Sequence, residues 1–429
     1  MNLLIRNGRV IDPASRLDCI GDVLITNGTI AQTGEYIIID DPQLPQFAAT
    51  GLIVSPGFVD LHCHLREPGF EEKETIATGT MAAAKGGFTT VCCMPNTNPP
   101  IATRDVMGQV LQIAQREGVI RVLPIAAVTA GRNGAQLADL DDLHNAGAVA
   151  FSDDGSPVHN SEIMRQALEQ SKALGIPIMN HCEDLALSGD GAMNEGKTSA
   201  RLGYKGIPAA AEETMIARDI ALAKDTGGLL HIAHVSTAGS VELIRKAKDE
   251  GISITAEVTP HHLTLTEETV IEHGTNAKVN PPLRTMNDIE ALIAGLRDGT
   301  IDAIATDHAP HTHDDKAQSF DQAAFGISGF ETAFGSLMTL VHRGSIDLAT
   351  IISKLTIEPA KILGNPQISA TMKIGSTADI TIFDPCAEWT VNPNNFVSKG
   401  KNTPLAGTVL KGKVIATIVA GHLVYEADS

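Results

Sequence analysis

Residues 52–64 read LIVSPGFVDLHCH, and this stretch sets the pattern for the whole fold. An apolar run ends in two histidines, His62 and His64, that are separated by one residue. Because alternate side chains of a β-strand lie on one face, both imidazoles can converge on one metal ion while Cys63 points the other way. An isolated pair of this kind is a weak signal, so its meaning depends on the rest of the chain.

Short β-rich runs alternate with helical stretches over residues 53–365, which is typical of βα units around a parallel sheet. Eight runs are present, the number of strands in a TIM barrel, at 58–61, 88–93, 121–125, 148–151, 176–180, 229–233, 252–258 and 303–305. The helices expected between them include 75–85, 161–174, 212–224 and 240–249. We therefore predict an α/β protein whose main domain, residues 53–365, is a (β/α)8 TIM barrel.

Both ends of the chain carry short alternating or β-branched runs without intervening helices. These runs are 3–11, 22–33, 378–383, 408–411 and 414–424. We expect them to pair into one small, discontinuous β-sandwich domain formed by residues 1–52 plus 366–429. At 429 residues the chain is longer than a bare barrel needs, which agrees with an added domain.

The charge balance excludes several classes of function. Lys and Arg total 32 and Asp and Glu total 51, which gives a formal net charge of −19. This charge opposes binding to nucleic acid or to an anionic membrane surface, and no apolar run reaches membrane-spanning length. The first residues lack the pattern of a signal peptide, so we expect a cytoplasmic protein. The six cysteines, including adjacent Cys92 and Cys93, indicate reduced thiols rather than a disulfide framework.

Four further candidate metal ligands follow later predicted strands, namely Asp154, His181, His234 and Asp307. The carboxyl ends of barrel strands meet at one mouth, where a barrel enzyme assembles its active site. Six ligands exceed the three protein ligands that a catalytic zinc uses, so we predict two adjacent metal ions. His62, His64 and Asp307 would hold one ion, His181 and His234 the other, and one carboxylate would bridge them. Imidazole and carboxylate ligands favour zinc, with cobalt or manganese as substitutes.

Four stretches of the chain resemble the dihydroorotase family of the amidohydrolase superfamily, in its longer class I branch. They are GFVDLHCHLREPG at 57–69, MPNT at 94–97, FSDDG at 151–155 and ATDHAPH at 305–311. The resemblance covers essentially the whole chain, and it implies that Asp154, rather than Asp153, is the bridging ligand. Many relatives, including hydantoinases and allantoinases, use a carbamylated lysine there, which this sequence lacks. We therefore expect the second ion to be held less tightly than the first.

The resemblance implies the reversible cyclisation of N-carbamoyl-L-aspartate to (S)-dihydroorotate and water, a step of de novo pyrimidine biosynthesis. Two metal ions that share a hydroxide provide a nucleophile at neutral pH and polarise the substrate carbonyl. We predict that Asp307 is the catalytic residue. A ligand with a free carboxylate oxygen can accept the hydroxide proton and deliver it to the departing ring nitrogen.

The substrate carboxylate needs a cation, and Arg66 is expected to supply it through its planar guanidinium. Arg66 lies two residues beyond His64, so we expect it on the same strand face. An ordinary surface ion pair with Glu67 or Glu71 is the alternative. The resemblance adds further contacts, so the predicted substrate-binding set is His64, Leu65, Arg66, Asn96, Asn280, His311, Phe325 and Gly326. Asn96 and Asn280 lie next to prolines, so a turn-forming role is a rival interpretation for both.

The polar segment 311–329, directly after Asp307, is expected to form a mobile flap over the substrate, with a loop that has no gating role as the alternative. Cys182 is expected to be a packed thiol, because strand alternation aims it away from the site. Whether His261 and His262 support the site or pack in the core stays open.

Two other functions stay open. One is a different cyclic amidase, such as an allantoinase or a hydantoinase, and the absent bridging lysine counts against it. The other is a non-catalytic partner subunit of aspartate transcarbamoylase, and the full ligand set counts against it. A complex with aspartate transcarbamoylase is compatible with catalysis, and we also expect the chain to form a homo-oligomer.

Overall fold

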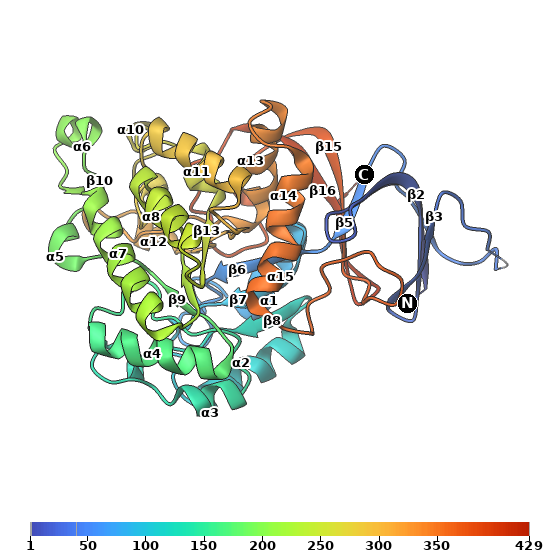
Figure 1. Ribbon diagram of the computed structural model, residues 1–429. Helices are drawn as coiled ribbons and strands as arrows, with labels where there is room; N and C mark the ends of the chain where they lie inside the picture. The colour runs from blue at the N-terminus through green and yellow to red at the C-terminus, as the bar shows by residue number, and fades with distance from the viewer. Residues whose placement is uncertain (1, 40, 429) are drawn as a thin grey trace.

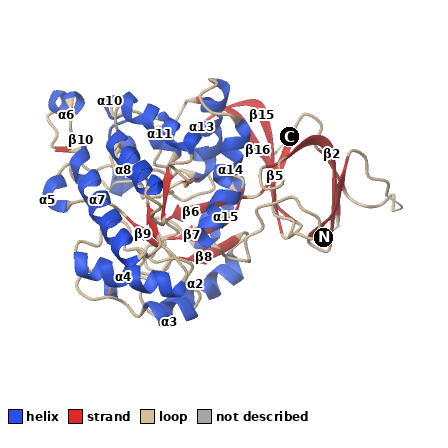
Figure 2. Cartoon of the chain, in the orientation of Figure 1, coloured by secondary structure: helices blue, strands red, loops and turns tan. Residues whose placement is uncertain are grey.

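The computed structural model describes residues 2–39 and 41–428. A barrel of parallel strands, surrounded by helices, occupies most of the molecule, and a small β-domain lies at one side and contains both ends of the chain (Figures 1 and 2). Within the described ranges, no helix combines the length and the apolar character that crossing a membrane requires.

Two parallel sheets and two connecting segments close the barrel. The first sheet has the order β6 (Phe58–Cys63), β7 (Phe88–Cys93), β8 (Arg121–Pro124). The second has the order β14 (Ala303–Ile304), β13 (Ile254–Val258), β12 (Leu230–Ile232), β9 (Ile178–Asn180). Phe151 joins the sheets through parallel bridges to Ala126 and Ile178, and a bridge between Cys63 and His308 closes the ring. The predicted (β/α)8 barrel is confirmed.

The fourth predicted strand, 148–151, is wrong as a regular strand, because only the bridge at Phe151 remains of it. The neighbouring chain segments carry Pro124 and Pro177, which have no backbone N–H to donate into a ladder. Their carbonyls still accept hydrogen bonds from Val149 and Phe151, at 3.2 and 3.0 Å. Further backbone hydrogen bonds hold the segment between its neighbours, from Ala126 to Ala150 at 3.1 Å, from Ser152 to Ala126 at 2.8 Å and from Met179 to Phe151 at 2.8 Å.

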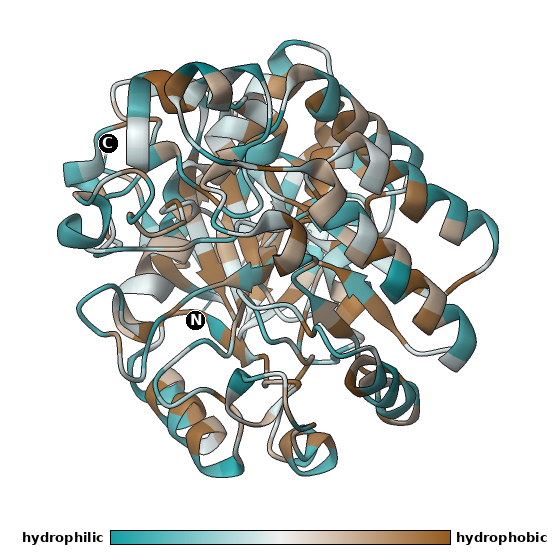
Figure 3. Ribbon diagram, turned by 90° about the vertical axis from the view of Figure 1, so that its left-hand side faces the viewer, coloured by the Kyte–Doolittle hydropathy of each residue, from teal (hydrophilic) through white to brown (hydrophobic). Residues whose placement is uncertain are grey.

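Helices cover the outside of the barrel and surround central strands that are largely hydrophobic (Figure 3). The longer ones are α1 (Ile76–Lys85), α2 (Arg104–Glu117), α4 (Ser161–Leu174), α7 (Ala209–Thr226), α8 (Ala238–Asp249), α11 (Met286–Asp298), α13 (Phe330–His342), α14 (Leu348–Leu355) and α15 (Ile357–Leu363). Helices α1, α4, α7 and α8 correspond to the four that the sequence predicts, with ends that differ by up to three residues.

Shorter elements decorate the loops between strands and helices. They are α3 (Leu140–Asn145), α5 (Leu185–Ser188), α6 (Lys197–Leu202), α9 (Pro260–Thr264), α10 (Thr269–His273), α12 (His313–Lys316), the 3-10 turns η1 (Ala130–Arg132), η2 (Gly274–Ala277) and η3 (Pro393–Asn395), and the strand pair β10 (Met193–Asn194) and β11 (Gly206–Ile207).

The small domain is built around one sheet that combines strands from both ends of the chain. Its order is β17 (His422–Glu426), β16 (Val409–Val419), β15 (Ile380–Thr390), β5 (Ile53–Pro56), β1 (Leu3–Asp12), β2 (Leu17–Thr26), β3 (Thr29–Gly34), with β4 (Gln46–Ala48) paired to β1. Because β5 pairs with β1 and β15, these pairings place the crossing into the barrel at Gly57 rather than at residue 53. The two runs predicted at 408–411 and 414–424 form β16 and β17, which divide after Val419 rather than at residues 412–413.

Candidate active site at the barrel mouth

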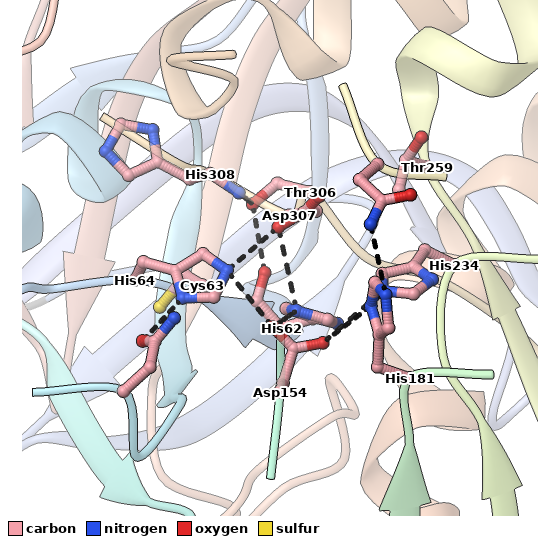
Figure 4. A network of polar contacts seen from close by, with 12 residues as sticks. His62, Cys63, His64, Asp154, His181, His234, Thr259, Thr306, Asp307 and His308 are labelled. Atoms are coloured by element: carbon pink, nitrogen blue, oxygen red, sulfur yellow. Dashed lines mark hydrogen bonds and ion pairs between the residues drawn. The ribbon is translucent and has the colours of Figure 1, made fainter. Parts of the chain in front are cut away.

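The structure brings all six predicted metal ligands together at the carboxyl ends of the barrel strands (Figure 4). Each follows or ends a strand or bridge of the barrel, and each is almost fully buried, with at most 7% of its surface exposed. The six come from five different strand ends: His62, His64, Asp154, His181, His234 and Asp307. Segments that are far apart in the sequence therefore place these side chains at one mouth of the barrel.

Asp154 lies between two pairs of histidines and turns one carboxylate oxygen toward each pair (Figure 4). Its Oδ2 lies 3.4 Å from His62 Nε2 and 3.6 Å from His64 Nε2. Its Oδ1 lies 3.5 Å from His181 Nδ1 and 3.3 Å from His234 Nε2. One carboxylate thus belongs to both ligand groups, which is the arrangement that a bridging ligand requires.

Asp307 completes the first ligand group. Its Oδ1 lies 3.0 Å from His64 Nε2 and 3.6 Å from His62 Nε2. Burial raises the pKa of Asp307, but the hydrogen bond with His64 and the interaction with His62 outweigh burial and hold the pKa below its ordinary value. Asp307 is therefore a carboxylate at neutral pH, which is the form that can accept a proton.

The geometry and chemistry of the donors fit divalent metal ions. Nitrogen and oxygen ligands about 2.1 Å from a tetrahedral ion lie about 3.4 Å from one another, which is close to the observed separations. Two buried atoms that face the center of the site, His62 Nε2 and Asp154 Oδ1, have no hydrogen-bond partner among the described residues. Buried polar atoms seldom stay unpaired, so a cation explains both. Imidazole and carboxylate donors without thiolate suit zinc.

Three residues of the site adopt a left-handed backbone conformation that is unusual for residues other than glycine. The φ angle is 64° at Arg66, 34° at His234 and 44° at Asp307. Such a conformation costs about 1–3 kcal/mol at each position, and the surrounding fold must hold it. Directing these three side chains into the barrel mouth therefore lowers the stability of the folded chain.

Two glutamates that the sequence analysis missed, the buried Glu257 and the partly buried Glu183, contact the candidate ligands from behind. Glu257, on β13, lies 2.8 Å from His62 Nδ1 and 3.1 Å from His231 Nε2. Burial raises its pKa, but these two histidines outweigh burial and lower the pKa to about 2. Glu183 lies 3.2 Å from His181 Nε2. No ligand spacing marks either glutamate in the sequence.

Replacing Glu257 with glutamine should weaken metal binding about 10–100-fold, the usual loss when a group that orients a metal ligand is removed. The amide keeps the shape of the side chain but loses the negative charge that makes His62 a better donor. Competition with a chromogenic chelator measures the change, and Glu250→Gln, at an exposed position, is the matched control. Equal metal affinities for the two variants would show that Glu257 does not support metal binding.

A cavity of about 270 Å³ opens beside the ligands and contains the predicted carboxylate-binding groups. The Arg66 side chain is buried, and burial lowers its pKa to about 10, so the guanidinium stays charged at neutral pH. His311 Nε2 lies 2.8 Å from the Phe325 carbonyl and 3.3 Å from Arg66 Nη2. Burial and the charge of Arg66 lower the pKa of His311 to about 3, so its ring is neutral. One buried cation in an acidic protein thus faces the cavity.

Arg66 reaches the cavity by a different route from the one predicted. Strand β6 ends at Cys63, so Arg66 does not share a strand face with His64. Its left-handed backbone and a hydrogen bond of 3.3 Å from Nε to the Pro310 carbonyl place it instead. The alternative of a surface ion pair with Glu67 or Glu71 does not fit a buried side chain.

The other predicted substrate contacts fall into two classes. Those that line the cavity are His64, Arg66, Asn96, Asn280, His311, Phe325 and Gly326. Asn96 Oδ1 lies 2.8 Å from His64 Nδ1, so Asn96 contacts a candidate ligand directly. Asn280 Nδ2 donates to Glu183 at 2.9 Å, so it contacts the glutamate that lies beside His181. Leu65 differs, because its side chain packs in the hydrophobic core. We therefore expect any contact between Leu65 and the substrate to come from the Leu65 backbone.

The three remaining sequence questions receive partial answers. The Cys182 thiol is buried and packs beside Asn180 and Asp219, as predicted. His262 bonds to the Pro281 carbonyl at 2.9 Å, which is a structural role. Segment 311–329 is folded onto the mouth and includes α12, and its motion stays a prediction.

Comparison with known proteins agrees with this geometry. A family model described as "Dihydro-orotase-like" matches residues 51–240. A dihydroorotase from Thermoanaerobacter sp. (strain X514) is 55% identical over 429 residues, which cover 100% of this chain and 98% of that protein. A dihydroorotase from Syntrophus aciditrophicus (strain SB) is 51% identical and is covered in full.

Solved structures show the same architecture. The L-hydantoinase (dihydropyrimidinase) from Arthrobacter aurescens superposes with a TM-score of 0.89 at 26% identity, covering 100% of this chain and 97% of that one. The dihydropyrimidinase from Brevibacillus agri NCHU1002 superposes with a TM-score of 0.86, covering 99% of this chain and 95% of that one; its 24% identity supports the fold alone.

Proposed function

The chain belongs to the dihydroorotase family and acts in pyrimidine biosynthesis, and from this premise we propose how its barrel mouth interconverts N-carbamoyl-L-aspartate and (S)-dihydroorotate. The observation that carries the proposal is the position of Asp154, whose two oxygens face two separate histidine pairs beside a cavity that contains Arg66. This combination provides for metal binding and for recognition of an anionic ring.

We propose that the mouth holds two zinc ions per chain, with Asp154 as the shared ligand. His62, His64 and Asp307 would hold one ion, and His181 and His234 the other. When bound, such ions polarise a carbonyl group and lower the pKa of water at the site.

In this proposal Asp307 moves the proton. During hydrolysis its carboxylate accepts a proton from the attacking water, the bond between the ring nitrogen and the carbonyl carbon breaks, and Asp307 delivers the proton to that nitrogen. In the biosynthetic direction the steps reverse: the ureido nitrogen gives its proton to Asp307 and bonds to the carbon of the side-chain carboxyl group. A C–O bond of that group breaks, and Asp307 gives the proton to the departing oxygen, which leaves as water. Asp307 is ionised at neutral pH, so it begins the hydrolytic direction in the form that can accept a proton.

Substrate orientation is assigned to the cavity wall. Arg66 would pair with the substrate carboxylate, with Asn96 and His311 beside it, while Asn280 and the backbone at Phe325 and Gly326 would contact the ring. A buried guanidinium can pair with a carboxylate through two parallel hydrogen bonds, which fixes the plane of the substrate.

Replacing Arg66 with lysine should raise KM for dihydroorotate about tenfold or more and change kcat far less, because hydrogen bonds to charged groups contribute about 1.5–3 kcal/mol. Lysine keeps the charge but loses the planar pair of donors. Steady-state kinetics in the hydrolytic direction measure the split. Arg104→Lys, at an exposed ion pair with Asp142, is the control. A KM equal to that of the control would show that Arg66 does not bind the carboxylate.

The direct test is turnover of dihydroorotate and of N-carbamoyl-L-aspartate by the zinc-loaded chain, with metal analysis on the same sample. We expect turnover in both directions, and much lower rates with allantoin or hydantoin. A wide preference for allantoin or hydantoin would replace this proposal with a different cyclic amidase. No turnover at full metal content would favour the non-catalytic role.

We also propose a cytoplasmic enzyme that forms a homo-oligomer and associates with aspartate transcarbamoylase. Light scattering of the chain alone, and then mixed with aspartate transcarbamoylase, tests both associations. A mass equal to that of a single chain, unchanged by mixing, would contradict them.

A further inference from the structure

A segment of the small domain crosses onto the barrel mouth between β15 and β16. In this segment Ser398 Oγ donates to Glu74 at 2.5 Å, and the side chain of Asn402 is inserted between two loops that line the cavity. Only 4% of the Asn402 surface is exposed. The segment packs closely, because a Cβ atom at Gly400 would lie 2.5 Å from Pro310 Cβ and from Ser328 Oγ.

Asn402 uses the full hydrogen-bonding capacity of its amide. Its Oδ1 accepts from the backbone N–H of His311 at 3.0 Å and from Ser328 Oγ at 2.9 Å. Its Nδ2 donates to the carbonyls of Ala309 and Gly326, both at 3.0 Å. A primary amide has two donor and two acceptor sites, and all four are occupied here. Aspartate cannot donate to the two carbonyls, and leucine can make none of the four bonds.

The two loops that Asn402 joins carry the residues assigned to the substrate. The first contains Ala309 and His311, and the second contains Phe325 and Gly326, all of which line the cavity. The loops touch where Gly326 has a φ angle of 139°, and a Cβ atom there would lie 2.7 Å from Ala309 Cβ. The amide of Asn402 therefore ties the two loops together beside this close contact, next to the direct backbone hydrogen bond of 2.9 Å from Ala309 to the Ile327 carbonyl.

We infer that Asn402 is a positioning residue that holds the carboxylate-binding part of the substrate cavity in shape. This inference rests on the proposed function of the cavity. Asn402 acts through His311 and Gly326 and does not itself line the cavity. Its loss should therefore weaken substrate binding more than it slows the proton transfers at Asp307.

The test compares Asn402→Asp with Asn394→Asp, an exposed position in the same segment that receives the same change in charge. We expect Asn402→Asp to raise KM for dihydroorotate about tenfold, since unpaired buried polar groups cost about 1–3 kcal/mol. We expect kcat to fall less than threefold and zinc content to stay unchanged. Titration calorimetry of N-carbamoyl-L-aspartate, with Asp307→Asn as the common background, should show the same weakening without turnover.

A second variant guards against misfolding of the first. Ser328→Ala removes one of the four bonds to the Asn402 amide, and we expect a KM about two to five times that of the wild-type chain. An unchanged KM in Asn402→Asp, or a fall in kcat and melting temperature at constant KM, would overturn the inference and leave Asn402 a structural residue. Loss of turnover in the wild-type chain would instead overturn the proposed function.

Discussion

Replacing Asp307 with asparagine should lower kcat for ring closure and for hydrolysis by about 10³-fold, within the range that general acid–base groups contribute. Asparagine has nearly the same shape and can still place an oxygen near His64 and His62, so folding and metal content should stay close to those of the wild-type chain. It cannot accept the proton of the attacking water, which is the step assigned to Asp307. Stopped assays in both directions measure the loss.

The matched control is Asp314→Asn, because Asp314 lies shortly after Asp307 in the chain but is almost fully exposed. It should retain the wild-type rate. Metal analysis and a melting curve on each variant separate lost chemistry from lost structure. If Asp307→Asn turned over at the rate of Asp314→Asn, another group would have to move the proton.

The convergence of the six candidate ligands could be predicted from the sequence because a parallel barrel converts positions along the chain into positions in space. His181 and His234 are 53 residues apart in the chain, yet their ring nitrogens lie 2.9 Å apart. Each follows an apolar run that forms a strand, and the ends of such strands share one mouth. This prediction required only the positions of the strands and the types of the residues that follow them.

Other parts of the site leave no comparable pattern. Glu257 lies within a strand and faces His62 because the barrel is closed, not because of its place relative to a motif. Arg66 owes its position to a left-handed backbone, which its sequence does not mark. Asn402 comes from the other end of the chain and reaches the mouth through a loop between two long strands. Long-range contacts of this kind depend on tertiary structure.

Replacing Asp154 with alanine should remove both metal ions, because Asp154 is the carboxylate that both candidate ligand groups share among the residues that the structure describes. Removing a group that only orients a ligand costs about 10–100-fold in affinity, so losing the ligand itself should exceed that range. Activity should fall in proportion to bound metal, and added zinc should not restore it. Elemental analysis after gel filtration measures the metal content per chain.

Asp153→Asn is the control, because it also removes one negative charge, at the residue next to Asp154. The Asp153 carboxylate accepts hydrogen bonds from the backbone of Val128 and Thr129 and does not face the histidines, and an amide can keep these contacts. Arg132 donates to the backbone carbonyls of Asp153 and Asp154, so alanine at position 154 leaves the loop held in place. Normal metal content in Asp154→Ala, or loss of metal in Asp153→Asn, would show that Asp154 is not the shared metal ligand. The histidine pairs would then have to bind their ions independently, and no shared carboxylate would couple them.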